Sequence, residues 1–445
     1  MKEITLDDMR VHVGQEVLVR GWLSNKRSSG AIIFLQIRDG FGFIQAVCSK
    51  SEVGKDAFEE IGRLTLESSI KVWGKLIEEK RSPEGYEIEV TKLDVLCLSP
   101  EDYPIQKKRD GSSHSISFLM DNRHFHLREK RQWAIQRVRN TIINSMYECL
   151  NKEKFIKIDS PIFTPNACEG TTTLFEVDYL PAWEEGAKTG PKVYLSQSGQ
   201  LYLEAAIMSL GRVFDFGPVF RAEKSKTRRH LTEFWMMDAE AAFYDHRDNI
   251  KLQEKLTKFI IKNVLEKNKS ELKILARDTT ILKNCLSKSF EIITHKDAVK
   301  ILQKLGSDIT EREDLGADDE TILTKQYNTP IFVEKYPKEV KAFYMKEDPK
   351  DSSRLLCSDM LAPEGYGEVI GGSQREDDYD KLIQRINDEK LNMDDFKWYL
   401  DLRKYGSVPH SGFGVGLERY IAWICGLKHI RETIPFPRLI NRIKP

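Results

Sequence analysis

The sequence predicts an α+β protein, with a small N-terminal β-barrel of five strands followed by a larger domain built on an antiparallel sheet flanked by helices. Three observations predict this class. Five short segments rich in Val, Ile, Phe and Trp fill the first hundred residues, one long amphipathic helix follows, and strand pairs then alternate irregularly with helices. Hairpins mixed with segregated helices favour an antiparallel sheet over a doubly wound parallel sheet.

The composition is that of a globular chain, and it narrows the function. Hydrophobic residues make up 40% and charged residues 31%, which excludes a collagen-like or disordered chain. The 69 Lys and Arg balance the 69 Asp and Glu, so any site for a polyanion must be a local patch. No apolar run approaches the ~18 residues of a membrane span, and the start does not have the pattern of a signal peptide. The seven cysteines, none in a C-x-x-C pair, fit reduced thiols. We therefore expect a cytoplasmic protein without a membrane partner.

The first domain is expected to cover residues 1–100. Its strand-like segments, separated by Gly and Ser-Pro-Glu-Gly turns, are residues 17–24, 31–39, 42–49, 69–79 and 86–98. Five strands favour an OB-fold, with an SH3-like barrel as the alternative. Phe34 and Gln45 lie on adjacent strands around the turn at 38–40. A Phe there is ordinarily a core residue, but an exposed Phe could stack on an unpaired base while Gln reads the edge of that base.

A polar stretch with Pro, Gly and Ser, residues 101–124, is predicted to be a hinge, which leaves 125–445 for the second domain. A helix is expected to begin near Leu127 and to continue to Glu153, because apolar residues recur at helical spacing. A strand that ends at Pro161 follows it. The charged stretch 305–325 is expected to be a solvent-exposed helical excursion.

The first candidate site surrounds a basic loop. Six of the eleven residues from Phe220 to His230 can carry positive charge, which in most sequences indicates a solvated hairpin tip. Here Arg221 and Glu223 are expected to alternate on a strand and share a face, with Phe234 on the return strand beside them. Arg can form a bidentate contact with a phosphate, Glu can accept from an exocyclic amine, and Phe can stack on a purine. Together they predict a nucleotide site that uses no Walker loop.

Glycines and an arginine mark the second candidate, residues 412–419 (GFGVGLER). The Gly spacing differs from the dinucleotide fingerprint, and no βαβ unit surrounds it. Close packing of a strand on a helix would explain the glycines, but bare glycines also let a ligand approach the backbone. Arg419 would lie in the first turn of a helix, an end that favours anions, and its guanidinium could hold a terminal phosphate there.

Two further clusters are polar. Asp359 and Glu368 are candidate ligands of Mg²⁺, which takes oxygen ligands and would shield ATP phosphates, although an acidic loop is the simpler interpretation. Residues 196–204 (SQSGQLYLE) concentrate amides and hydroxyls around a glycine. This pattern is typical of a helix N-cap, and it is also what a pocket for a polar small molecule requires.

Together these motifs resemble the class II aminoacyl-tRNA synthetases of the aspartate/asparagine/lysine subgroup, and among them most closely the asparaginyl enzymes. Motif 1 would be the long helix with the strand ending at Pro161, motif 2 residues 220–234, and motif 3 residues 412–419. All three occur in order with family-like spacing, and the resemblance covers nearly the whole chain. It implies an OB-fold that binds the anticodon, a class II catalytic domain, and a homodimer formed through motif 1.

The resemblance also implies a role for each candidate residue. The catalytic residues would be Arg221, at the α-phosphate of ATP, and Arg419. The further residues implied for ATP binding are Glu223, Arg229, His230, Phe234, Gly416 and Glu368, of which Glu368 would also bind Mg²⁺ beside the candidate Asp359. Those for the amino acid are Glu169, Ser196, Gln197, Gln200, Glu204 and Arg375, and those for the anticodon are Phe34 and Gln45. A hydroxyl ligand of several relatives is replaced here by Gly371.

The choice between asparagine and aspartate depends on one pocket position. Aspartyl enzymes place a Lys in the segment corresponding to 197–204, where this chain has Leu203 followed by Glu204. A carboxylate without an ammonium neighbour would repel aspartate and could accept from the asparagine amide, while Arg375 could donate to either. The sequence therefore favours ATP-dependent ligation of L-asparagine to tRNA(Asn) through asparaginyl-adenylate, with release of AMP and pyrophosphate. The alternatives are an aspartyl enzyme, discriminating or not, a related asparagine synthetase, and an inactive tRNA-binding protein.

Overall fold

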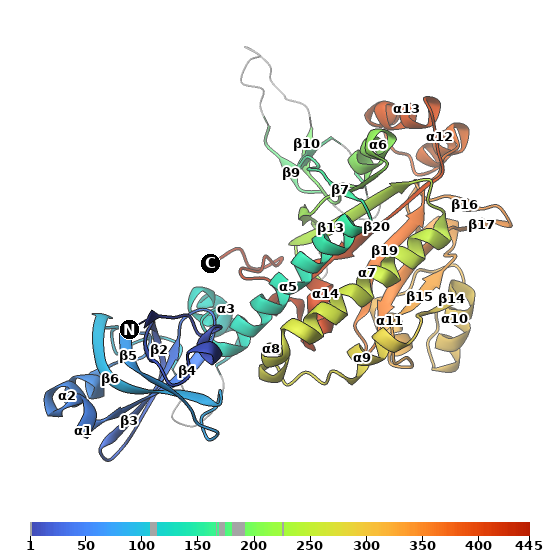
Figure 1. Cartoon of the computed structure of the whole chain (residues 1–445). Helices are drawn as coiled ribbons and strands as arrows, with labels where there is room; N and C mark the ends of the chain where they lie inside the picture. Colours follow the sequence, from blue (N-terminus) through green and yellow to red (C-terminus); the bar gives the residue numbers. More distant parts are fainter. Residues whose placement is uncertain (1, 107–113, 166, 169–173, 180–191, 225–226) are drawn as a thin grey trace, which may run out of the picture. The chain divides into compact units, whose positions relative to one another are not determined.

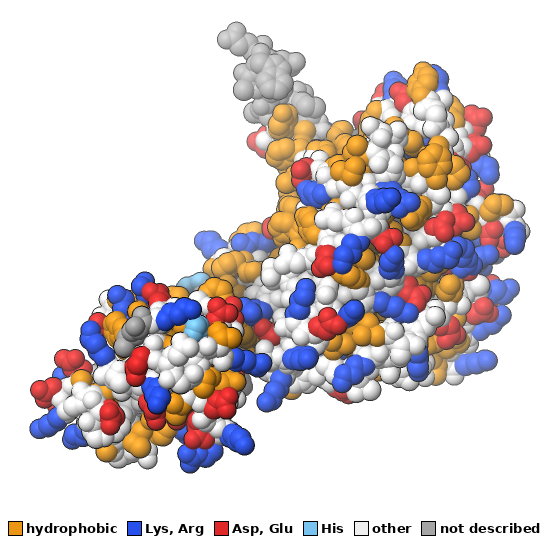
Figure 2. Space-filling model, in the orientation of Figure 1, with side chains coloured by type: hydrophobic (Ala, Val, Ile, Leu, Met, Phe, Trp, Pro, Cys, Tyr) orange, Lys and Arg blue, Asp and Glu red, His pale blue; other side chains and the backbone are white. Residues whose placement is uncertain are grey.

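The computed structural model describes residues 2–106, 114–165, 167–168, 174–179, 192–224 and 227–445. The chain forms two compact units, residues 1–125 and 126–445 (Figure 1). Acidic and basic side chains are interspersed over the face drawn in Figure 2, in line with the zero net charge. Within the described ranges, no helix combines the length and the apolar character needed to cross a bilayer.

The first unit contains a closed five-stranded barrel, as predicted. Its strands pair in the ring order β2, β3, β4, β6 and β5, and β5 pairs again with β2. Alternate residues along each strand point inward, such as Ile33, Leu35 and Ile37 on β3, and they form the core of the barrel. The strands are β2 (Glu16–Ser29), β3 (Ile32–Arg38), β4 (Phe43–Ser49), β5 (Ser69–Glu78) and β6 (Tyr86–Cys97), with β1 (Lys2–Glu3) beside β2.

Helices occupy two places in this unit that strand patterns alone did not predict. Two short helices join β4 to β5, and two more follow the barrel inside the stretch predicted to be a hinge. They are α1 (Lys50–Val53), α2 (Lys55–Arg63), α3 (Ile116–Asp121) and α4 (Arg123–His126), and a 3-10 turn covers Met9–His12. The role of residues 101–124 as a hinge stays a prediction.

The second unit is built on a nine-stranded sheet with antiparallel strands at its centre. The order is β14-β15-β18-β19-β20-β13-β11-β7, with β12 paired to β13. The outer pairs β14–β15 and β11–β7 are parallel, so the sheet is mixed at its ends. The strands are β7 (Ile156–Lys157), β11 (Arg212–Phe214), β12 (Gly217–Phe220), β13 (Glu233–Ala242), β14 (Glu291–Thr294), β15 (Ile331–Glu334), β18 (Cys357–Ala362), β19 (Gly367–Gln374) and β20 (His410–Gly416).

Small sheets and helices surround this central sheet. The small sheets are β8 (Phe163–Thr164), β9 (Glu176–Val177) and β10 (Val193–Leu195), and β16 (Glu347–Asp348) with β17 (Asp351–Leu355). The helices are α5 (Lys130–Lys152), α6 (Gln200–Leu210), α7 (His246–Lys267), α8 (Lys269–Ile274), α9 (Thr280–Ser287), α10 (His295–Lys304), α11 (Ala317–Thr324), α12 (Tyr379–Asp388), α13 (Lys397–Lys404) and α14 (Leu417–Cys425). Further 3-10 turns cover Lys338–Val340, Met393–Phe396 and Ile430–Glu432.

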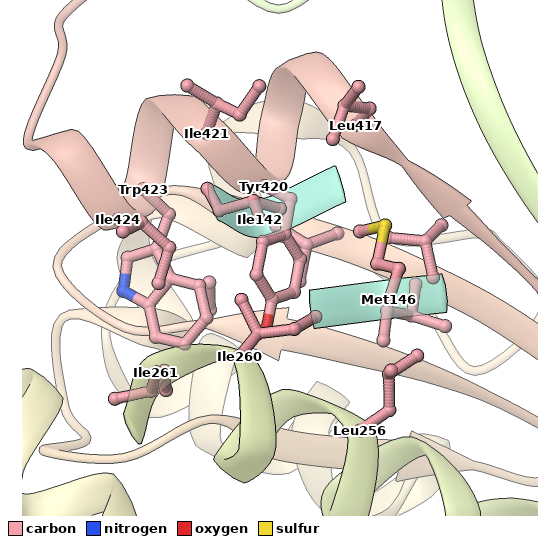
Figure 3. Close-up of a cluster of buried hydrophobic side chains, with 14 of the residues drawn as sticks. Ile142, Met146, Leu256, Ile260, Ile261, Leu417, Tyr420, Ile421, Trp423 and Ile424 are labelled. Carbon is pink, nitrogen blue, oxygen red and sulfur yellow. The ribbon is translucent and has the colours of Figure 1, made fainter. Parts of the chain in front are cut away.

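The main core lies between the sheet and helices α5, α7 and α14. Figure 3 shows Ile142 of α5, Ile260 of α7 and Tyr420 of α14 directed into one cluster of buried side chains. Burial of such side chains is worth about 1.5–3 kcal/mol each, so this cluster anchors the long helix to the sheet. The predicted long helix is therefore α5, although it begins at Lys130.

The predicted strand up to Pro161 is shorter than expected. Only Ile156–Lys157 belongs to β7, and β8 begins at Phe163, after the proline. The expectation that 305–325 is a solvent-exposed excursion is also wrong in part. Its Leu315 and Leu323 are buried in a second hydrophobic cluster of the unit 126–445, and α11 packs against β18 and β19.

Candidate active site

Strand alternation places a cleft on the face of the sheet opposite the helical core. On β13, Met237, Ala239 and Ala241 belong to the core, so the intervening residues face the other way. A cleft of about 930 Å³ lies on that side, and a smaller cavity of about 70 Å³ shares several of its walls. The shared lining residues are Arg221, Met236, Glu368 and Gly414.

The glycines of β20 admit acidic side chains into this cleft. Asp238 lies opposite Gly414 and Glu240 lies opposite Gly412 in the β13–β20 register. A Cβ at Gly412 would stand 1.9 Å from Glu240 Oε1, and one at Gly414 would stand 2.6 Å from Asp238 Oδ1. Besides the strand packing or ligand approach expected from the sequence, these glycines make room for two carboxylates. Residues 236, 238 and 240 alternate in step with Phe234 along the strand, so their side chains point to the same face of the sheet. This alternation could have predicted Asp238 and Glu240 as residues of the cleft side.

Arg221, Glu223 and Phe234 come together in the smaller cavity, as predicted. They do not do so by alternating on one strand, because β12 ends at Phe220. The N–H of Arg221 donates to the carbonyl of Thr232 at 3.0 Å, which keeps the segment beside β13. The Arg221 guanidinium carbon lies 5.6 Å from the centroid of the Phe234 ring. A charge, a carboxylate and an aromatic face therefore border one cavity, which suits a purine nucleotide.

Cations and carboxylates alternate at the next part of the cavity. Arg419, in the first turn of α14, donates from Nη1 to Glu368 Oε2 at 2.8 Å. His230 lies 3.3 Å from a Glu223 carboxylate oxygen. Burial and the nearby Arg419 lower the pKa of His230, so its imidazole is disposed to be neutral at pH 7. Gly416, the residue before α14, lines the same cavity, together with Arg229.

Asp359 and Glu368 flank Gly371 on adjacent strands. A Cβ at Gly371 would stand 3.0 Å from Glu368 Oε1 and 3.5 Å from Asp359 Oδ1. Lys341 Nζ lies 3.0 Å from Asp359 Oδ2, and burial raises the pKa of Asp359 to about 6, with Lys341 opposing the shift. Both carboxylates line the large cleft. Two hard oxygen ligands beside a cavity fit Mg²⁺, which keeps several waters and also takes phosphate oxygens.

The described side chains of this site do not supply a complete set of metal ligands. Within the described ranges, no group of three or more His, Cys, Asp or Glu residues is arranged to hold an ion. Waters and the oxygens of a bound phosphate would complete the shell around an ion held by the two carboxylates. Gly371 contributes no side chain at the point between the two carboxylates.

Three of the residues predicted to bind the amino acid lie around the turn before α6, at the other end of the large cleft, and of these three only Gln200 lines it. Ser196, Gln197 and Gln200 are all buried, and Gln200 lines the cleft with Ser198. Ser198 Oγ donates to Asp238 Oδ2 at 2.7 Å, which ties the turn to β13. The side-chain oxygen Oε1 of Gln197 accepts from the backbone N–H of Cys168 at 3.3 Å. Glu169 lies outside the described residues.

Glu204 does not present a bare carboxylate to the cleft, which corrects the sequence analysis. The side chain is fully buried and is not among the residues lining the cleft. Arg403 Nη2 lies 2.6 Å and His410 Nε2 3.0 Å from its Oε2, and the Tyr399 hydroxyl donates to it at 2.8 Å. Burial opposes ionisation, but Arg403 and His410 hold the pKa of Glu204 well below its usual range. The expectation that Glu204 faces the pocket as an unpaired carboxylate is therefore wrong.

A second buried ion pair stands beside the first. Arg375 lines the cleft, and its guanidinium forms a forked contact with Glu240, with Nε 3.2 Å from Oε1. Arg375 Nη1 also donates to Ser373 Oγ at 2.7 Å. Burial opposes the charge, but Glu240 holds the pKa of Arg375 above its ordinary value. The amino-acid end thus contains two guanidinium groups, each with a carboxylate of its own. The buried Glu204–Arg403 pair is connected to the cleft through Gln200, a lining residue, because Gln200 Nε2 donates to Glu204 Oε1 at 3.0 Å.

Comparison with known proteins decides the family. Residues 115–440 match the class II tRNA synthetases (D, K and N), and residues 17–96 match the OB-fold nucleic acid binding domains. The chain belongs to the class II tRNA synthetases of the D, K and N family. The resemblance inferred from the three motifs is confirmed.

Full-length relatives of this class II synthetase are asparagine–tRNA ligases. It is 49% identical to that of Pelotomaculum thermopropionicum over 100% of both chains. It is 51% identical to that of Desulforamulus reducens over 98% of this chain and 97% of the relative. Its structure is similar to the crystal structure of asparaginyl-tRNA synthetase from Pyrococcus horikoshii complexed with asparaginyl-adenylate, with TM-score 0.92 and 45% identity over 99% of each chain.

In the barrel of this synthetase, Phe34 and Gln45 lie on the outer face. Phe34 and Gln45 are half-buried, whereas their strand neighbours Leu35 and Ala46 are fully buried. Arg27 links the two, because its guanidinium carbon stands 4.3 Å from the Phe34 ring centroid and Nη2 donates to Gln45 Oε1 at 3.4 Å. Gln45 also donates to Glu87 at 3.0 Å. The Phe is therefore available for stacking, and the core interpretation does not apply to it.

Proposed function

We propose that this chain is an asparagine–tRNA ligase, which joins L-asparagine to tRNA(Asn) through an asparaginyl-adenylate and releases AMP and pyrophosphate. The observation that carries the proposal is one continuous cleft with two chemically different ends. One end has the guanidinium, carboxylate and aromatic groups that suit ATP, and the other has amides and closed ion pairs that suit a neutral side chain.

The two closed ion pairs explain a preference for asparagine over aspartate. Arg375 is neutralised by Glu240, and Arg403 is neutralised by Glu204. An aspartate carboxylate entering this end would lose its hydration without meeting an uncompensated cation, which is costly in a buried site. The asparagine carboxamide carries no charge and can satisfy its amide with neutral donors and acceptors such as Gln200. Asparagine is thus preferred over aspartate because each guanidinium of the pocket already has a carboxylate partner. Repulsion of aspartate by an unpaired Glu204 is not required.

The first reaction step is a displacement at phosphorus that needs no protein nucleophile. The α-carboxylate of asparagine attacks the α-phosphorus of ATP in line, a new P–O bond forms, and the bond to pyrophosphate breaks with its electron pair leaving on pyrophosphate. Arg221 would stabilise the charge that develops on the α-phosphate, and Arg419 and His230 would hold the terminal phosphates. Phe234 and Glu223 would fix the adenine. When bound at Asp359 and Glu368, Mg²⁺ would supply positive charge to the phosphate oxygens.

In the second step a terminal ribose hydroxyl of the tRNA attacks the carbonyl carbon of the adenylate and an ester C–O bond forms. The bond from that carbon to the phosphate oxygen breaks, and AMP leaves with its electron pair and can take up the hydroxyl proton. The outer face of the barrel, with Phe34 and Gln45, would bind the anticodon, because exposed aromatic and amide groups read unpaired bases. Two chains would associate through motif 1, which contains α5 and the strand β7 at the edge of the sheet. All seven cysteines are free thiols, which supports a reducing compartment such as the cytoplasm.

A charging experiment tests the proposal. The purified chain, ATP, Mg²⁺ and total tRNA are incubated with labelled asparagine or labelled aspartate, and the amino acid released from the tRNA is identified. We expect label on tRNA with asparagine and not with aspartate. Charging with aspartate alone would indicate an aspartyl enzyme, and amide formation without tRNA would indicate an asparagine synthetase.

A further inference from the structure

Helix α11, in the charged stretch 305–325, reaches the phosphate end of the cleft. The helix packs against β18 and β19, the strands that carry Asp359 and Glu368. Asp318 of this helix is exposed, whereas the Glu320 side chain is only 13% exposed. An acidic side chain of the stretch is thus directed into the protein at a functional end of the sheet.

Glu320 joins two parts of the site through one carboxylate oxygen. Its Oε2 accepts from Arg229 Nη1 at 2.8 Å and from the backbone N–H of Glu368 at 3.2 Å. Gly367 makes this approach possible, since a Cβ there would stand 2.2 Å from the same oxygen, and its φ of +75° favours glycine. The backbone beside the predicted metal ligand is therefore built to receive this carboxylate.

Arg229 is committed to protein contacts in this arrangement. Besides Glu320, Nη1 donates to the carbonyl of Ala317 at 3.1 Å. Nη2 donates to Thr321 Oγ1 at 2.5 Å and to the carbonyl of Gly365 at 2.7 Å. The two terminal nitrogens of a guanidinium carry four N–H bonds, and these four acceptors use all of them. In this arrangement Arg229 shapes the wall of the cavity, and the phosphate contact expected from the sequence stays a prediction.

We propose that Glu320 is a positioning residue for ATP: by fixing Arg229 and the backbone of Glu368, it holds the wall of the phosphate end in the shape that accepts the triphosphate. This inference rests on the proposed function, because it assumes that ATP occupies this end. The ion pairs of the amino-acid end are formed by other residues, so the binding of ATP and the binding of asparagine respond differently to changes at Glu320.

The test compares Glu320→Ala and Glu320→Gln with Asp318→Asn, which removes the same charge from the exposed side of the same helix. The dissociation constant of ATP with Mg²⁺ is measured by calorimetry, and the KM values for ATP and asparagine are measured by ATP–pyrophosphate exchange. We expect Glu320→Ala to weaken ATP binding about tenfold or more, since hydrogen bonds to charged groups are lost. The KM for asparagine should stay within about twofold of its original value, and Asp318→Asn should behave as the unaltered chain.

Glu320→Gln separates positioning from folding, because the amide keeps the volume and one acceptor oxygen. It should recover part of the lost ATP affinity. The double change Arg229→Ala with Glu320→Ala should weaken ATP no more than the stronger single change, because both act on one contact. Equal loss of ATP and asparagine binding, or unchanged ATP binding in Glu320→Ala, would overturn the inference. Exchange and charging by the unaltered chain test the proposed function separately, and calorimetry does not depend on turnover.

Discussion

The two ends of the cleft hold their charges in different ways. At the amino-acid end the side chains of Arg403 and Glu204 are both 0% exposed, and those of Arg375 and Glu240 are 3% and 1% exposed. At the phosphate end the side chains of Arg419 and Glu368 are 27% and 35% exposed. Both ends contain ion pairs, but the Arg419–Glu368 pair of the phosphate end is far more exposed to water than either pair of the amino-acid end.

This difference separates selection from catalysis. Buried, closed pairs are costly to break, so the amino-acid end keeps one electrostatic state and rejects an additional charge. Half-exposed pairs cost less to exchange, so Arg419 can leave Glu368 for a phosphate, and Glu368 can then turn to a metal ion. Arginine–carboxylate pairs thus select the amino acid at one end of the cleft, where they stay paired. At the phosphate end they can exchange their partners for a ligand.

The largest effect is expected from breaking the phosphate end. Arg221→Ala removes a guanidinium from the α-phosphate, and we expect asparagine-dependent exchange to fall by about 10²–10³-fold or more. Circular dichroism and thermal unfolding should be unchanged, since Arg221 borders a cavity. Lys224→Ala, an exposed cation of the same loop, is the control and should retain activity. Normal exchange by Arg221→Ala would refute its assignment.

The next effect comes from opening a closed pair at the amino-acid end. Glu204→Gln leaves Arg403 without its carboxylate, so aspartate gains a cation and asparagine loses the network around Gln200. We expect the ratio of kcat/KM for asparagine to that for aspartate to fall by about 10–100-fold. Glu271→Gln is the matched control, because it removes the partner of Arg137 outside the cleft. If the ratio of kcat/KM for asparagine to that for aspartate falls equally in both variants, the closed Glu204–Arg403 pair does not determine the preference.

A smaller effect, on tRNA binding, is expected from a change in the barrel, which takes no part in the binding of ATP or asparagine. Phe34→Ala removes a stacking surface, which is worth about 1–3 kcal/mol per base. The KM for tRNA in charging should therefore rise about tenfold or more, while ATP–pyrophosphate exchange without tRNA stays unchanged. A variant that loses exchange to the same extent as charging would show that Phe34 acts on folding.

The smallest effect concerns a pair of like charges behind the amino-acid end. Burial and the neighbouring Asp238 raise the pKa of Asp215 to about 7. A raised carboxyl pKa means that ionisation costs stability, so the penalty is absent below the unfolded pKa near 4 and complete above pH 7. Asp215→Asn should therefore raise Tm at pH 8, by about 2 °C or less for each kcal/mol removed in a unit of this size, and by less at pH 5.5. A difference in Tm that does not grow with pH would exclude this cause.

Local patterns predicted the barrel strands and the nucleotide end well. The five predicted strand segments differ from β2 to β6 by a few residues, because alternation of buried and exposed side chains is a local property. Arg221, Glu223 and Phe234 were predicted together, since the hairpin that joins them is short in sequence.

Tertiary partners could not be predicted in the same way. Glu204 and Arg403 are 199 residues apart, and their contact depends on the packing of α13 beside α6. The role of Glu320 depends likewise on α11 reaching Gly367. One feature of the sequence could have predicted more: the strand alternation along β13 places Asp238 and Glu240 on the cleft side of the sheet.

The most direct test of the closed pairs is ATP–pyrophosphate exchange by the unaltered chain with asparagine or aspartate as the sole amino acid. We expect a kcat/KM for asparagine at least about 10²-fold above that for aspartate, since an uncompensated buried charge costs several kcal/mol. Equal exchange with the two amino acids would contradict it.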